Sequence, residues 1–237
     1  MITEKPRMTI FGVIEVEPLS GRPKAPVGIT TGLLVALLIP WLVGVSLLII
    51  LLPPFTHNFA VWLVDTENSA VSHAELVDTA DAGLAFVTGQ SDWLPRGWSY
   101  RFAFTDDAVS HLEDVRSILY MAKATTVALS ILVVLLAVIV FVLGRAAALG
   151  RALRIAAVLT MALVAVLVLA GWLNFDWLFT TMHSLLFAEG TWMFYGDSLL
   201  LTAYPLPFWI AMAASWAVVL AVLCLVIGKL GRILTSR

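Results

Sequence analysis

The chain has 237 residues, of which 61% are hydrophobic and only 13% are charged, and its net charge is −2. A mean hydropathy of +0.97 excludes an ordinary soluble domain and predicts an integral membrane protein. The near-neutral charge argues against nucleic acid as a partner, and the single cysteine, Cys224, excludes an intrachain disulfide and a cysteine-based zinc motif.

Four apolar runs are long enough to cross a bilayer, which requires roughly 20 residues, and none has a charge at its centre. The sequence therefore predicts an all-α, polytopic membrane protein with four transmembrane helices and a mostly helical cap built from two outer loops. In chain order the expected segments are an N-terminal arm (1–27), a first span (28–52), a long loop (53–118), a second span (119–143), a short link (144–152), a third span (153–173), a second loop (174–207), a fourth span (208–230) and a tail (231–237).

Basic residues concentrate in the arm, the short link and the tail. The positive-inside rule then places both termini in the cytoplasm and the two longer loops outside the plasma membrane. The arm is rich in proline, glycine and charge, which predicts disorder.

The outer loops carry helical patterns. Apolar residues recur at helical spacing within 70–88, and Thr105 is a plausible N-cap for a helix that runs straight into the second span. In the second loop, helical spacing of apolar residues from Phe175 to Leu186 predicts an amphipathic helix on the membrane surface.

Two histidines are the strongest candidates for chemistry. His111 lies before the second span and His183 after the third, so both are expected near the same water–lipid boundary, where an imidazole can take and return a proton. Asp114 shares a helical face with His111 and could orient its ring. The alternatives are a solvated helix face for His111 and an interfacial anchor for His183.

Other residues at this boundary have two interpretations each. Arg116 could bind a head group or an anionic intermediate, or could pair with Glu113 on its own helix. Trp192 could line an acyl groove or pack the cap onto the membrane. The sequence has no GxSxG, HExxH or P-loop motif, and a bis-histidine haem or metal site has no further support.

The order of these residues resembles the lipoprotein intramolecular transacylase (Lit) family. The resemblance rests on His111-Leu112-x-Asp114-Val115 before the second span, and on His183, Phe187, Trp192, Phe194, Asp197 and a proline before the last span. It implies an enzyme of the bacterial cell envelope that moves an acyl chain from the sn-2 position of a diacylglyceryl-cysteine lipoprotein to the α-amino group of that cysteine, forming the lyso-form. It implies no cofactor.

The resemblance also implies roles for residues of this chain. His111, oriented by Asp114, would be the base and His183 its partner, and an acyl-imidazole intermediate remains an open variant. Arg116, Phe187, Trp192 and Asp197 would contact the lipid or lipoprotein substrate.

Two other functions remain open on the residues alone. A non-catalytic outer-face module that binds lipid or protein would keep the histidines apart, or bury each against its own local partner. A transporter is disfavoured because none of the four spans carries a charge at its centre. No pattern indicates the oligomeric state.

Overall fold

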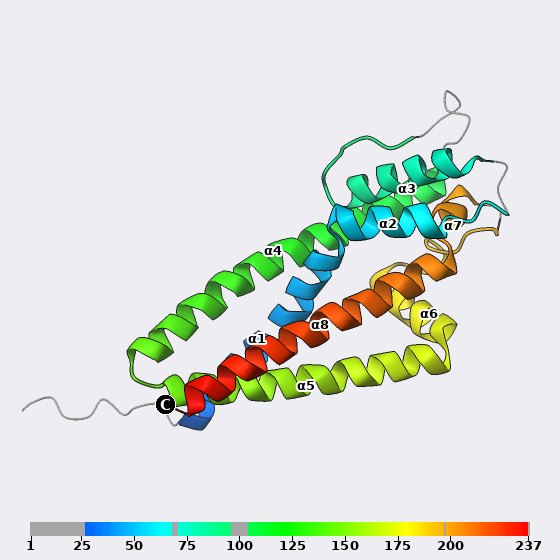
Figure 1. Cartoon of the computed structure of the whole chain (residues 1–237). Helices are drawn as coiled ribbons and strands as arrows, with labels where there is room; N and C mark the ends of the chain where they lie inside the picture. Colours follow the sequence, from blue (N-terminus) through cyan, green and yellow to red (C-terminus); the bar gives the residue numbers. More distant parts are fainter. Residues whose placement is uncertain (1–26, 68–70, 96–103, 197, 237) are drawn as a thin grey trace, which may run out of the picture.

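The computed structural model describes residues 27–67, 71–95, 104–196 and 198–236. Within this part of the chain the structure is built from helices, which confirms the predicted all-α class (Figure 1). They are α1 (Val27–Ile50), α2 (Pro53–Leu63), α3 (His73–Val87), α4 (Asp106–Val142), α5 (Ala146–Leu173), α6 (Phe175–Leu186), α7 (Leu199–Ala203) and α8 (Leu206–Thr235). The predicted arm, except for Val27, and Asp197 lie outside the described residues.

Four of these helices, α1, α4, α5 and α8, are long and apolar enough to cross a membrane, as predicted. The helix α5 packs closely along α8, because glycines face each other: a Cβ added to Gly231 would lie 2.6 Å from the carbonyl oxygen of Gly150. The helix α1 is tied to α4 by the indole of Trp41, which donates a hydrogen bond to Ser130 Oγ over 2.9 Å. Cys224 is buried in the core between these helices.

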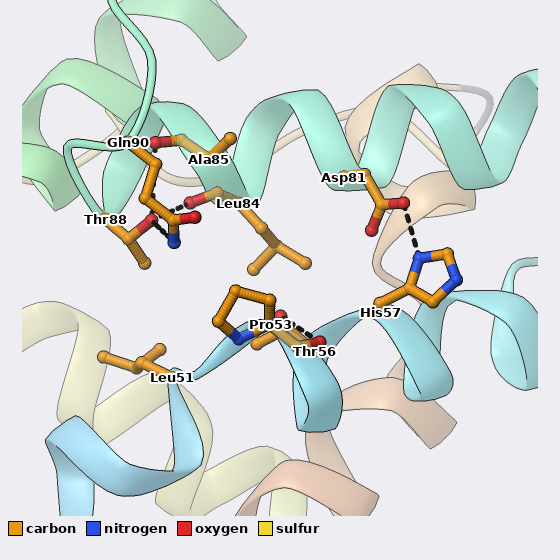
Figure 2. Close-up of a pocket in the computed structure, with 9 residues that line it drawn as sticks. All are labelled: Leu51, Pro53, Thr56, His57, Asp81, Leu84, Ala85, Thr88 and Gln90. Carbon is orange, nitrogen blue, oxygen red and sulfur yellow. Dashed lines mark hydrogen bonds and ion pairs between the residues drawn. The ribbon is translucent and has the colours of Figure 1, made fainter.

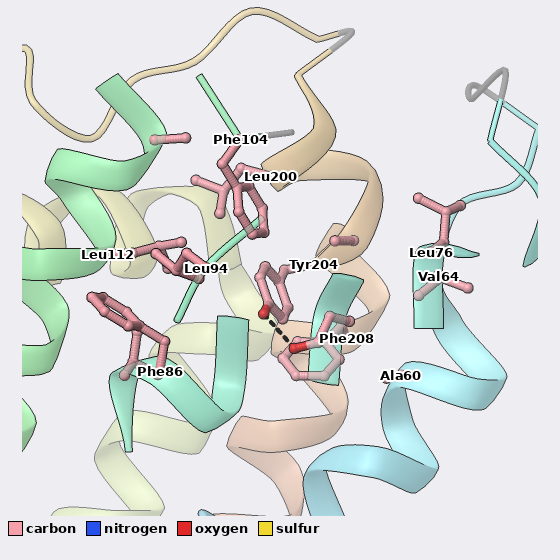
Figure 3. Close-up of a cluster of buried hydrophobic side chains, with 14 of the residues drawn as sticks. Ala60, Val64, Leu76, Phe86, Leu94, Phe104, Leu112, Leu200, Tyr204 and Phe208 are labelled. Carbon is pink, nitrogen blue, oxygen red and sulfur yellow. Dashed lines mark hydrogen bonds between the residues drawn. The ribbon is translucent and has the colours of Figure 1, made fainter. Parts of the chain in front are cut away.

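The shorter helices α2, α3 and α7 gather with the first turns of α4 at one end of the bundle (Figure 1). We call this assembly the cap. Its buried cluster includes Leu76, Phe86, Leu112 and Phe208, so it joins α3, α4 and α8 (Figure 3). At its centre the hydroxyl of Tyr204 donates a 2.6 Å hydrogen bond to the carbonyl of Ala80, on the helix that the 70–88 pattern predicts. Burial raises the pKa of Tyr204, so the hydroxyl stays a neutral donor.

The long helix α4 carries His111 into the cap. Thr105 is its N-cap, as predicted, and accepts a hydrogen bond from the backbone N–H of Ala108. At 1.5 Å per residue the 37 residues of α4 extend about 55 Å, well beyond a hydrocarbon core of about 30 Å. Its first turns, which contain Asp106, Asp107 and Asp114, therefore project beyond the hydrocarbon.

Candidate active site

The structure brings His111 and His183 together. His111 comes from the second turn of α4 and His183 from the last turn of α6, and each residue is only 7% exposed. Their ring centroids lie 6.1 Å apart, with 25° between the ring planes. Two imidazoles from distant parts of the sequence thus share one buried site, which neither a solvated helix face nor a surface anchor explains.

The helix α6 sets the protonation of His183. Its Nδ1 lies 2.9 Å from the carbonyl oxygen of Phe179, one turn earlier, and this atom must donate because the carbonyl can only accept. In the neutral ring the proton therefore sits on Nδ1, and Nε2 keeps a lone pair. Burial lowers the pKa of His183, and the bond to Phe179 offsets this only in part, so the ring is a neutral base at physiological pH.

His111 has a different environment. Its ring is enclosed by Phe187 at 4.7 Å and Phe194 at 5.5 Å between centroids, and its Nδ1 is buried without a hydrogen-bond partner in the described part of the chain. Asp114, which the sequence predicts to orient this ring, is exposed. It forms no hydrogen bond with that Nδ1, so its contribution stays a prediction.

A cavity of about 100 Å³ lies against the two histidines. It has room for several water-sized groups, and its lining is mostly apolar. Trp192 lines it with its ring 5.1 Å from that of His183, and the indole Nε1 is buried without a partner among the described residues. The residues that line the cavity are Leu84, Val87, His111, Leu112, Val115, Phe179, His183, Trp192, Phe194, Leu200, Leu201, Tyr204 and Trp209.

Of the other residues predicted to contact the substrate, Phe187 lies at the histidine pair and Arg116 does not. Phe187 touches both histidines, with its ring 4.7 Å from His111 and 5.5 Å from His183. Arg116 is not part of the cavity lining. Its guanidinium pairs with Asp92, reaches the carbonyl of Ser91 and stacks 4.6 Å above the ring of Phe86, so it fastens the segment after α3 to α4.

Sequence reasoning missed part of the site. Phe179 was expected only as an apolar anchor on the membrane surface, but its carbonyl holds His183 and its ring lies 3.9 Å from the imidazole. Tyr204 and Trp209 also line the cavity. Their place beside a proline near the last span is the only signal that could have suggested them.

A second, larger cleft of about 240 Å³ lies between α2 and α3 (Figure 2). In this cleft the Nδ1 of His57 contacts Asp81 Oδ2 at 2.6 Å. The Thr88 hydroxyl likewise donates to the carbonyl of Leu84 and accepts from Gln90. The polar groups of this cleft satisfy one another, whereas those beside His111 do not, so the histidine cavity is the stronger candidate.

The described residues contain no group of three or more histidine, cysteine, aspartate or glutamate side chains that could hold a metal ion. The site itself is a pair of imidazoles beside an aromatic, largely apolar cavity, which suits proton transfer at a lipid-borne group.

Comparisons with known proteins identify the family of this chain. The family model "Lipoprotein intramolecular transacylase Lit" matches residues 31–209. The chain is similar in structure to the membrane-integral lipoprotein intramolecular transacylase Lit from Bacillus cereus, with a TM-score of 0.75, 15% identity, and 89% of this chain and 96% of that chain covered. Two variants of the Bacillus cereus protein, in which a histidine is replaced by arginine or alanine, match with TM-scores of 0.71 and 0.70, at 16% and 15% identity, over 89% of this chain and 92% and 94% of theirs.

No curated protein sequence matches the chain. The structural similarity shows a shared fold, and the family model spans most of the chain, which confirms the resemblance of the sequence. The chain belongs to the Lit family of membrane-integral intramolecular transacylases, which are acyltransferase enzymes.

Proposed function

We propose that His111 and His183 together carry the proton of an acyl transfer within one lipoprotein molecule. The substrate is a diacylglyceryl-cysteine with a free α-amino group, and the product is the N-acyl, monoacylglyceryl lyso-form. The observation that carries this proposal is the stacking of two buried imidazoles against an apolar cavity. Protonation of both rings at once is unfavourable, because burial disfavours each charged imidazolium and because the two like charges would lie about 6 Å apart.

The reaction needs one proton to move twice. The amine nitrogen attacks the sn-2 ester carbon, and its proton passes to a neutral imidazole. The tetrahedral intermediate then collapses, the bond from the carbonyl carbon to the glyceryl oxygen breaks, and that oxygen receives the proton. Atoms and charge balance without any added reactant.

The geometry favours His183 as the base, because its bond to Phe179 leaves the lone pair on Nε2. This assignment reverses the roles predicted from the sequence, in which His111, oriented by Asp114, is the base and His183 is its partner. His111 is then the partner whose ring holds the reacting group and helps to return the proton. Asp114 acts only through its charge, since its carboxylate is exposed and forms no bond with the buried nitrogen.

The aromatic surroundings suit the lipid part of the substrate. Trp192 lines the cavity and Phe187 packs against both histidines, where the first carbons of an acyl chain would lie. Arg116 supports the cap from outside the cavity. Asp197 stays a proposed contact because it lies outside the described residues.

We infer that the site faces the outer leaflet of the plasma membrane and that both termini are cytoplasmic. Basic residues at the end of the bundle opposite the cap support this, namely Arg145, Arg151, Arg154, Lys229 and Arg232. The outer leaflet is also where a lipidated N-terminus would meet a site in the cap.

The direct test uses purified protein in liposomes and a synthetic diacylglyceryl lipopeptide with a free amine. Substrate and product are isomers, so their masses are equal and the readout must be fragmentation, which shows whether the acyl chain sits on nitrogen. We expect conversion by wild type and a loss of at least about 1000-fold in His111→Ala and in His183→Ala, by analogy with other proton-transfer units.

His73→Ala is the matched control, because His73 is an exposed cap histidine bonded to the carbonyl of Val61. It should keep full activity. An unchanged peptide after incubation with folded wild type would refute the proposed substrate. Full activity in either cavity variant would refute the proposed role of the pair.

A further inference from the structure

Buried polar atoms without partners cluster in the histidine cavity. The described residues contain three such side-chain atoms: His111 Nδ1, Trp192 Nε1 and Thr160 Oγ1. The first two belong to residues that line the same cavity. Buried polar groups are nearly always paired in folded proteins, so two unpaired atoms in one cavity indicate that a ligand supplies their partners.

The two atoms differ in the hydrogen-bond partners that they require. An indole N–H can only donate, so Trp192 requires an acceptor. In an acyl transfer the substrate has one acceptor whose charge grows during the reaction, the carbonyl oxygen of the ester. The ring of Trp192 lies 5.1 Å from that of His183, and both residues line the cavity, so the indole and the imidazole can contact the same bound group.

The backbone around Trp192 holds it in this position. The segment after α6 turns at Gly190, whose φ of 85° is one that a residue with a side chain rarely adopts. The N–H of Thr191 donates to the carbonyl of Ala188 over 3.2 Å and closes that turn. The indole therefore enters the cavity from a closed turn, as a preorganised donor should.

We propose that Trp192 Nε1–H is the oxyanion donor of the acyl transfer, a role that rests on the function proposed above. When the amine nitrogen bonds to the ester carbon, the carbonyl π electrons move to oxygen, and the indole hydrogen bond stabilises that charge. When the carbonyl re-forms, the bond to the glyceryl oxygen breaks and the proton held by the histidine pair goes to that oxygen. Trp192 itself neither gains nor loses a proton.

The test removes the N–H and keeps the ring. Trp192→Phe does so approximately, and replacement of Trp192 by benzothienylalanine does so with nearly the same shape. With the free-amine diacylglyceryl lipopeptide, we expect kcat to fall about 100-fold or more in both variants, with KM almost unchanged, because the bond strengthens only in the transition state.

Trp177→Phe is the matched control, since Trp177 is 59% exposed on α6 and is not part of the cavity lining. It should keep the wild-type kcat. A second readout uses the N-acetylated lipopeptide, which cannot react, with a ¹³C label at the sn-2 carbonyl. Its infrared stretch should move to lower frequency on binding to wild type, and this shift should vanish with benzothienylalanine.

The outcomes separate this role from the function itself. If wild type converts the lipopeptide, His183→Ala does not, and the benzothienylalanine protein keeps the wild-type kcat, Trp192 is a packing residue and the oxyanion role is wrong. If folded wild type fails to convert the lipopeptide, the proposed function fails first. A rise in KM with unchanged kcat would also overturn the oxyanion role.

Discussion

At the residue scale, one backbone hydrogen bond determines what His183 can do. The carbonyl of Phe179 accepts a hydrogen bond from Nδ1–H, which keeps the proton on Nδ1 and leaves a lone pair on Nε2, while burial keeps the ring neutral. His111 lacks such a partner in the described structure, which leaves its Nδ1 available to substrate. Two histidines in the same cavity thus differ in their local hydrogen-bond partners.

The lowered pKa of His183 makes a prediction about its titration. A lowered value means that the ring takes up its proton only when the pH falls below the ordinary histidine value of about 6.5. The pH profile of activity would also report the substrate amine, so the ring should be observed directly. We expect ¹⁵N-histidine NMR in micelles, assigned by the signal lost in His183→Gln, to show that the ring is more than half neutral at pH 6.5. A midpoint at or above 6.5 would contradict the burial argument.

Asp114 gives a second prediction at this scale. Loss of a carboxylate that orients a catalytic histidine by a hydrogen bond costs on the order of 10⁴ in rate. An exposed charge that acts through water contributes far less. We therefore expect Asp114→Asn to reduce the initial rate of lipopeptide conversion by less than about tenfold. A loss of about 1000-fold would mean that Asp114 orients His111 in the substrate complex.

At the element scale, periodicity and end signals predicted most helices but not all. The four spans, the helix at α3, the Thr105 cap and the amphipathic α6 all follow from local pattern. The helices α2 and α7 were not predicted. The first begins at Pro53-Pro54, which reads as a break although proline is well suited to the first turn of a helix, and the second has only five residues.

Close approach of α5 and α8 gives a prediction at this scale. A Cβ on residue 231 would meet the backbone oxygen of Gly150 at 2.6 Å, so the helices must separate to accommodate it. We expect Gly231→Ala to lower the free energy of unfolding by about 1–3 kcal/mol, measured by thermal unfolding in detergent. Gly32→Ala is the control, because nothing lies within 4 Å of its added Cβ, and it should not destabilise. Equal stability of the two variants would show that α5 and α8 are not in close contact.

At the scale of the whole molecule, the cap and the bundle have separate tasks. The bundle holds the protein in the bilayer, and the cap brings the end of α4 against α6 to form the cavity. The sequence alone predicted both histidines at one water–lipid boundary, because the positions of the four spans determine the depth at which each histidine lies. It could not show that Phe179 and Trp209 join them or that Arg116 turns toward Asp92, since these contacts depend on how the helices pack.

The proposed orientation can be tested on intact cells. Glu189 and Ser236 are exposed at opposite ends of the molecule, and the native Cys224 is only 2% exposed and should not react. A membrane-impermeant maleimide should label the Glu189→Cys protein from outside and should label the Ser236→Cys protein only after lysis. The reverse pattern would place the site on the cytoplasmic side.

The central claim is that His111 and His183 act as one proton-transfer unit. The most direct measurement compares the rates of lipopeptide conversion by His111→Ala, His183→Ala and the double variant, each verified as folded in liposomes. Members of one catalytic unit are strongly non-additive, so each single variant should lose about as much activity as the double variant. If the two losses instead multiply in the double variant, or if one single variant stays active, the histidines act independently and the claim is wrong.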